Sequence, residues 1–176
     1  MESPYQWFAM RATYKRELKA RDYLQNKGID VFVPLKKIIK VVGGVKRKVS
    51  VPAINSLIFV KAQKEVLQCA KVGIHYLQYI TKRVDGKNIP IIVPDRQMEE
   101  FILIAQDDTI DKTYLTPGEA DLKVGTRVKV HGGAFDGMEG VLVKIKGNKK
   151  RYFHVVVDEI VAVRIVIENV DLLEIV

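Results

Sequence analysis

Residues able to do acid–base or metal chemistry are few and scattered along this sequence. The three histidines, His75, His131 and His154, show neither the HxH nor the HxxxH spacing that brings two imidazoles to one metal ion. The single cysteine, Cys69, has no histidine close to it in sequence to act as its base. We expect these side chains to be ordinary strand, loop or helix residues, and we predict no metal site.

Paired acids and glycine-rich strings do not supply a catalytic site either. Glu99–Glu100 and Asp107–Asp108 are expected on a helix and at its exit, where solvated charge explains them better than acid–base chemistry. The sequence contains no GxxxxGK[ST], GxGxxG or GxSxG string, which would indicate phosphate, dinucleotide or acyl-transfer chemistry. We therefore expect a protein that is not an enzyme and that needs no cofactor.

The chemistry that the sequence favours is the binding of anions. Its 176 residues carry 29 Lys+Arg and 21 Asp+Glu, a formal net charge of +8. Residues 1–64 hold 14 basic and 4 acidic residues, whereas residues 65–120 hold 6 and 9, and residues 121–176 hold 9 and 8. Positive charge confined to the first third is typical of a polyanion-binding face, with solvated lysines spread over helices and strands as the alternative.

Composition also bears on where the protein works. One cysteine allows no internal disulfide, which fits a reducing compartment. No apolar run approaches the roughly 18 to 20 residues of a membrane-spanning helix, and the first residues lack a basic flank followed by an apolar stretch. We expect a cytoplasmic monomer with no membrane partner.

The elements that must position the basic residues can be read from periodicity and turn signals. We predict a strand over 5–12, a helix over 14–27 ended by Gly28, a hairpin over 30–51 turning at Gly43–Gly44, a buried strand over 55–62, a helix over 64–72, a strand over 74–80 and a helix over 94–106. The sequence thus predicts an α+β N-terminal domain over residues 1–106, with helices flanking a sheet.

Residues 107–121 are rich in acids, threonine, proline and glycine, and we predict a linker there. Short strand-like runs separated by Gly/Asn turns follow, and twelve of the 22 residues from Val155 to Val176 are Val or Ile. These features predict a small all-β barrel over residues 122–176. In it, Gly132, Gly133 and Gly137 are expected at positive φ, and Gly140 at a bulge or a close backbone approach.

Three segments resemble a known family. The opening YQWFAMRATYKRE resembles the start of the NusG N-terminal domain, and VGGVKRKVSVPAINSLIFVKA resembles that domain's glycine hairpin, turn and buried strand. The later VGTRVKVHGGAFDGMEGVLVKIKG is similar to the KOW motif. They cover nearly the whole chain in the family's order. The resemblance implies a transcription elongation or antitermination factor, with an antiparallel NusG-like domain joined by the linker to an SH3-like KOW barrel.

In this family the N-terminal domain binds the clamp helices of the β′ subunit of RNA polymerase. Counting from Gly43–Gly44, the family's Phe-Pro-Gly-Tyr turn falls on INSL at 54–57, so aliphatic residues replace both aromatics. By this resemblance the RNA polymerase-binding residues are Trp7, Phe8, Ile54, Asn55, Ser56 and Leu57. Core packing is the alternative for the four apolar ones, Trp7, Phe8, Ile54 and Leu57. Leu57→Asp is expected to abolish polymerase binding yet leave the protein folded.

A protein on the clamp helices lies close to the single non-template DNA strand. The residues that the resemblance directs toward its phosphates are Arg11, Lys15, Arg16, Lys19, Lys46, Arg47 and Lys48. Tyr14 is expected either to stack on a base or to be buried. For the KOW domain, the resemblance implies that Phe135 and Ile160 dock a ribosomal protein or the Rho terminator, with packing onto the barrel as the alternative for Phe135.

The implied mechanism is bridging without catalysis, in which one domain holds the polymerase clamp and the other recruits a partner. Within the family, the altered INSL turn favours a specialised paralogue of the UpxY type, which regulates polysaccharide operons, over housekeeping NusG. A ribosome-associated KOW protein that binds RNA is an alternative from another class. Its support is a basic patch of Lys144, Lys146, Lys149, Lys150 and Arg151.

Overall fold

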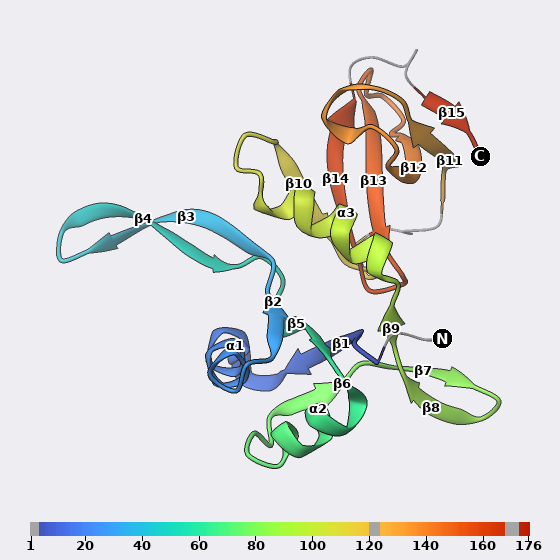
Figure 1. The fold of residues 1–176 in the computed structure, drawn as a ribbon. Coiled ribbons are helices and arrows are strands. Elements are labelled where there is room, and N and C mark those ends of the chain that lie inside the picture. Colours follow the sequence, from blue (N-terminus) through green and yellow to red (C-terminus); the bar gives the residue numbers. More distant parts are fainter. Residues whose placement is uncertain (1–3, 120–123, 168–172) are drawn as a thin grey trace. The chain divides into compact units, whose positions relative to one another are not determined.

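The computed structural model describes residues 4–119, 124–167 and 173–176. The chain divides into two compact units, unit 1 over Met1–Asp95 and unit 2 over Arg96–Val176 (Figure 1). Helices and strands alternate along unit 1, and strands dominate unit 2. The expected mixture of helix and sheet is confirmed.

Unit 1 is built on an antiparallel sheet with the strand order β2-β5-β1-β6. Its strands are β1 (Gln6–Ala12), β2 (Asp30–Phe32), β5 (Leu57–Ala62), β6 (Leu77–Tyr79) and β9 (Ile92–Val93), the last of which pairs with β1. Two helices accompany the sheet, α1 (Glu17–Asn26) and α2 (Lys64–Lys71). Gly28 follows α1 at a φ of +75°, as expected of a residue that ends a helix.

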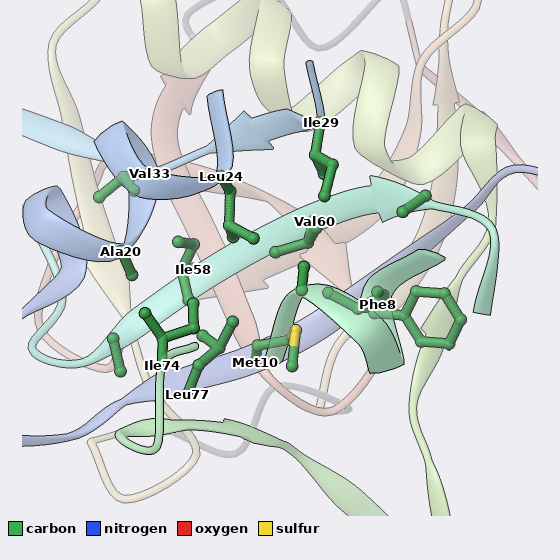
Figure 2. Close-up of a cluster of buried hydrophobic side chains, with 14 residues drawn as sticks. Phe8, Met10, Ala20, Leu24, Ile29, Val33, Ile58, Val60, Ile74 and Leu77 are labelled. Carbon is green, nitrogen blue, oxygen red and sulfur yellow. The ribbon is translucent and has the colours of Figure 1, made fainter. Parts of the chain in front are cut away.

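The core of unit 1 lies between this sheet and its helices. Figure 2 shows Ala20 and Leu24 of α1 among Met10 of β1 and Ile58 and Val60 of β5, and all five are fully buried. Alternate residues of β1 and β5 lie on the other face of the sheet and are buried as well. Burial on both faces explains why these strands are continuous apolar runs in the sequence.

Two hairpins extend from unit 1. The predicted glycine hairpin is confirmed as β3 (Leu35–Val42) and β4 (Val45–Pro52), with Gly43 and Gly44 at φ of +57° and +78°. A strand break after Phe32 separates β2 from β3. The second hairpin, β7 (Thr81–Val84) and β8 (Lys87–Pro90), was not predicted. Its signal is the dipeptide Asp85–Gly86, where both residues take positive φ.

Unit 2 contains an antiparallel sheet with the order β10-β14-β13-β12-β11-β15. The strands are β10 (Lys112–Leu115), β11 (Thr126–Val130), β12 (Glu139–Lys144), β13 (Arg151–Val157), β14 (Val161–Ile167) and β15 (Leu173–Ile175), with the short helix η2 (Gly133–Phe135) before β12. The short strands expected after residue 122 are therefore present in the described part of this unit. Gly132, Gly133 and Gly137 take positive φ, as expected.

Close backbone approach explains Gly140. A Cβ atom there would lie 2.4 Å from the carbonyl oxygen of His154 and 2.6 Å from Cζ of Phe153. Real Cβ atoms do not tolerate such distances, so β12 can lie against β13 at this point only because the residue is glycine. The close approach predicted for Gly140 is confirmed.

The structure divides the chain at a different point from the predicted boundary at residue 106. Helix α3 (Asp95–Gln106) contacts unit 2 through Arg96, which donates to the carbonyl oxygen of Gly137 at 2.9 Å, and through Phe101, whose ring lies 6.1 Å from that of Tyr114. Tyr114 belongs to β10, which lies inside the predicted linker and pairs with β14. The acidic residues of 107–121 are typical of a linker, so the sequence analysis did not predict this strand. The expected linker end and barrel start at 121 and 122 lie outside the described residues.

Within the described residues, no helix is long and apolar enough to cross a bilayer.

Candidate functional site

A strained, exposed segment joins β1 to α1. Tyr14 and Lys15 have φ of 59° and 54°, a left-handed conformation that is uncommon for residues with a Cβ atom. The segment is fixed at Thr13, whose backbone N–H and hydroxyl both donate to the carbonyl oxygen of Tyr76, at 2.9 and 3.3 Å. The Tyr14 side chain is 84% exposed, so the expectation that it packs in the core is excluded. Strain at an exposed aromatic residue suggests a functional constraint.

Arginine and tyrosine side chains gather on this segment. Cζ of Arg16 lies 5.5 Å from the ring centroid of Tyr14 and 5.0 Å from that of Tyr76. Nζ of Lys19, in the first turn of α1, lies 5.9 Å from the ring centroid of Tyr76. We call Tyr14, Arg16, Lys19 and Tyr76 the Tyr14 patch. A guanidinium between two rings and an exposed aromatic face are the groups that contact phosphates and unstacked bases.

The turn before β5 is tied to the same segment. The Glu17 carboxylate, buried at the start of α1, accepts a hydrogen bond from the backbone N–H of Ser56. The carbonyl oxygen of Ser56 accepts one from the N–H of Ala12, at 2.8 Å. Ser56 itself has a φ of 69°. Glu17 therefore holds the turn at residues 54–56 beside the start of α1, and Asn55 is exposed at that turn.

Burial divides the residues expected to bind RNA polymerase. Trp7, Phe8 and Leu57 are 8%, 1% and 4% exposed. Leu57 directly follows the turn and lies opposite Arg11 of β1, whereas Trp7 and Phe8 lie toward the other end of β5, opposite Lys61 and Val60. Ile54 and Ser56 are half-buried. Leu57→Asp, expected from the sequence to leave the protein folded, would bury a carboxylate in this sheet, so that expectation is corrected.

The basic residues expected to contact DNA are exposed, in two groups. Arg11, Lys15, Arg16 and Lys19 lie around the Tyr14 patch. Lys46, Arg47 and Lys48 lie on β4, in the ribbon that Figure 1 shows extending from the sheet. Sequence reasoning overlooked three basic residues on the facing strand β3, Lys36, Lys37 and Lys40. It also overlooked Tyr76, whose part in the Tyr14 patch depends on the tertiary fold.

In unit 2, Phe135 and Ile160 are both half-buried. Phe135 ends η2, and Ile160 lies in the turn between β13 and β14. Phe135 lines a cavity of about 670 Å³ together with eight other residues, among which Ile160 is not found. The others are Ile110, Asp111, Lys149, Lys150, Arg151, Ile165, Val166 and Ile167.

His154 is buried in β13 and is neutral in the folded chain. Its Nε2 accepts a hydrogen bond from Nε of Arg164 at 2.9 Å, and its Nδ1 has no partner among the residues that the structure describes. Burial lowers the pKa of His154 to about 4, with a further contribution from the positive charge of Arg164. Across residues 4–119, 124–167 and 173–176 no group of His, Cys, Asp and Glu side chains is suited to a metal ion.

Comparison with known proteins gives one family and weak structural likenesses. The family model NusG, described as transcription termination factor nusG, matches residues 5–102. A solved structure described as "Domain interaction in Thermotoga maritima NusG" has 20% sequence identity and a TM-score of 0.46, covering 98% of this chain and 97% of that one. A second, described as "Crystal Structure of MjSpt4:Spt5 complex conformation B", has 14% identity and a TM-score of 0.30, covering 97% and 96%.

Proposed function

The chain belongs to the NusG family of transcription factors, and from this premise we propose that it is an elongation or antitermination factor whose unit 1 binds RNA polymerase. The polymerase-binding surface is the turn at residues 54–56, and its target is the clamp helices of the β′ subunit. The protein acts by bridging and catalyses no reaction.

The observation that carries this proposal is the juxtaposition of the 54–56 turn and the Tyr14 patch. Glu17 and Ala12 hydrogen-bond to Ser56, so the turn and the first turn of α1 keep a fixed separation. A polymerase helix bound at Ile54 and Asn55 would leave the cations of the patch beside whatever nucleic acid runs past that helix. Leu57, which follows the turn, and Trp7 and Phe8, which lie further along the sheet, are buried and do not touch the partner themselves.

The non-template DNA strand is the ligand that suits the Tyr14 patch. Lys15, Arg16 and Lys19 supply charge for phosphates, which gives affinity without sequence preference. Tyr14 supplies a ring for a splayed base, worth about 1–3 kcal/mol per stacked base. Lys46, Arg47 and Lys48 on β4 extend the basic surface along the ribbon.

Unit 2 is the recruiting half of the molecule. We assign its strands from β11 onward to a KOW domain of SH3-like form, in which Phe135 and Ile160 face a ribosomal protein or Rho. The family match ends at residue 102, so this assignment rests on the glycine pattern at 132, 133, 137 and 140 and on the strand order.

The protein is a specialised paralogue of the UpxY type that acts on polysaccharide operons. The support is the 54–57 turn, where aliphatic residues and Asn-Ser stand in place of the family's aromatics and Pro-Gly. Housekeeping NusG is the alternative within the family. A ribosome-associated RNA-binding protein is the alternative from another class.

The test is binding to purified RNA polymerase elongation complexes, read by native gel shift, with intact ribosomes as the competing target. Asn55→Glu puts a charge on the exposed turn and is expected to weaken polymerase binding at least about tenfold, because a buried, unpaired carboxylate at the interface costs more than 1.4 kcal/mol. The matched control is Asn88→Glu, at an exposed asparagine on β8. Equal weakening by both variants, or retention by ribosomes alone, would refute the proposal.

A second pair of variants tests the nucleic-acid surface. Arg16→Gln is expected to reduce the salt dependence of binding to elongation complexes, because one phosphate contact is lost. Lys27→Gln removes another cation that lies over a tyrosine ring, 5.1 Å from Tyr23 at the far end of α1, and is expected to change nothing. If Arg16→Gln leaves the salt dependence of binding unchanged, the proposed contact with DNA is refuted, whereas the proposed contact with polymerase is not affected by that result.

A further inference from the structure

The cavity at Phe135 combines an apolar wall with a basic rim. The wall is formed by Phe135 and the branched side chains of Ile110, Ile165 and Ile167. Three basic residues, Lys149, Lys150 and Arg151, also line the cavity, together with one acid, Asp111. Its volume of about 670 Å³ lies within the range of roughly 300–1,000 Å³ that is typical of ligand sites.

The basic rim is held in shape by hydrogen bonds within its own loop. Asn148 accepts from the backbone N–H of Lys150 at 2.9 Å and donates to the hydroxyl of Tyr152 at 2.8 Å. Its own N–H donates to the carbonyl oxygen of Ile145 at 3.0 Å. A loop ordered before binding loses less conformational entropy when a ligand arrives, so its cations are well placed to select an anionic one.

From this chemistry we infer that the cavity binds an acidic, amphipathic peptide segment of a partner protein. Aliphatic or aromatic side chains of the segment pack on Phe135, Ile165 and Ile167, and its carboxylates pair with Lys149, Lys150 and Arg151. The inference rests on the proposed recruiting role of unit 2 and adds to it the class of partner.

Charge and wall composition favour a peptide over RNA. Residues 96–176 hold 11 Lys+Arg and 14 Asp+Glu, so unit 2 as a whole repels a long polyanion while the local rim attracts a short one. A single-stranded nucleic acid would need successive aromatic faces for its bases, and the cavity offers one ring among branched aliphatic side chains.

The experiment is a fluorescence anisotropy titration of the full chain against three labelled probes: a short peptide of alternating Glu and Leu, its Lys–Leu counterpart, and an oligouridylate. We expect the Glu–Leu peptide to bind most tightly, and its binding to weaken with added salt. Tighter binding of the oligouridylate or the Lys–Leu peptide, or no binding of any probe, would overturn the inference.

Variants locate the site. Lys149→Gln with Lys150→Gln is expected to weaken peptide binding about fivefold, since two partly exposed ion pairs are lost. The control is Lys144→Gln with Lys146→Gln, which removes the same charge from exposed positions outside the cavity and is expected to change binding less than about twofold. Phe135→Ala is expected to weaken binding about tenfold, and Phe135→Leu, which keeps an apolar side chain and guards against misfolding, by less. Equal effects of the two lysine pairs would overturn the assignment to this cavity.

Failure here is separable from failure of the proposed function. The Lys149→Gln, Lys150→Gln variant is expected to bind elongation complexes like the unaltered chain, because that contact belongs to unit 1. If the unaltered chain does not bind polymerase, the proposed function is refuted. The peptide titration still tests whether the cavity binds an acidic segment, because it does not involve polymerase.

Discussion

Acidification is expected to destabilise unit 2 through one residue, His154. A protonated imidazole needs two hydrogen-bond acceptors, but Nε2 of His154 faces the cationic Arg164, and no described residue offers an acceptor to its Nδ1. Burial first, and then the positive charge of Arg164, lower the pKa of His154 from 6.5 to about 4 in the folded chain. Since the unfolded chain takes up the proton more readily, stability is full above pH 6.5 and falls as the pH drops toward 4.

The two pKa values set the size of this effect. Their difference corresponds to about 3 kcal/mol of unfolding free energy once the pH is below both values. At pH 5 the same linkage gives a loss of about 2 kcal/mol relative to pH 8. For a domain of this size such a loss is a large part of the total stability.

The assay is denaturant unfolding at pH 8 and pH 5, followed by NMR signals from unit 2, for the natural chain and for His154→Gln. Glutamine keeps an acceptor for Arg164 and cannot titrate, so subtracting its pH dependence cancels that of the exposed acids common to both chains. We expect the natural chain to lose about 2 kcal/mol more than the variant over this interval. Equal losses, or a His154 imidazole that titrates near pH 6.5 in the folded chain, would refute the reasoning.

Three further substitutions test separate features. Gly140→Ala is expected to destabilise unit 2 by about 2–3 kcal/mol, because its Cβ would meet the backbone of β13. Gly118→Ala, whose Cβ would meet no atom of the described residues within 4 Å, should be neutral in the same unfolding measurement. Leu57→Asp is expected to unfold unit 1, because the side chain is buried and a carboxylate there would lack solvent. The readout is Trp7 fluorescence, which should no longer show an unfolding transition when denaturant is added. A variant that stays folded would contradict the burial argument. Tyr14→Asn is expected to raise unfolding free energy by about 1 kcal/mol through relief of left-handed strain, while weakening single-stranded DNA binding up to about tenfold in anisotropy titrations; stronger DNA binding would exclude a stacking role.

Most of the fold followed from local patterns. The buried runs at β1 and β5, the Gly43–Gly44 hairpin, the stop at Gly28 and the close approach at Gly140 each have a cause within a few residues, so the sequence predicted them. Strand β10 was missed because its acidic and polar neighbours resemble a linker, and what makes it a strand is pairing with β14, about 50 residues later in the chain. The β7–β8 hairpin was overlooked although its Asp-Gly turn is a local signal.

The candidate site was anticipated by residue type and only partly by location. The sequence predicted Arg16, Lys19 and the INSL turn as site residues, because charge and a departure from the family's turn can both be read directly from the residue types. It left open whether Tyr14 is exposed and whether Leu57 is buried, because alternation along a strand does not say what covers each face.

By itself, then, the sequence determined the helices and most strands of unit 1, and that the first third carries the positive charge, since these depend on residue types and on neighbours within one or two turns of backbone. Strand β10 was not determined in this way, because it depends on pairing with a distant strand. Only the tertiary structure decided that Tyr76 joins Arg16 and Tyr14 and that Glu17 holds the 54–56 turn. Those contacts join residues tens of positions apart, and which of them form depends on how the whole chain closes its cores.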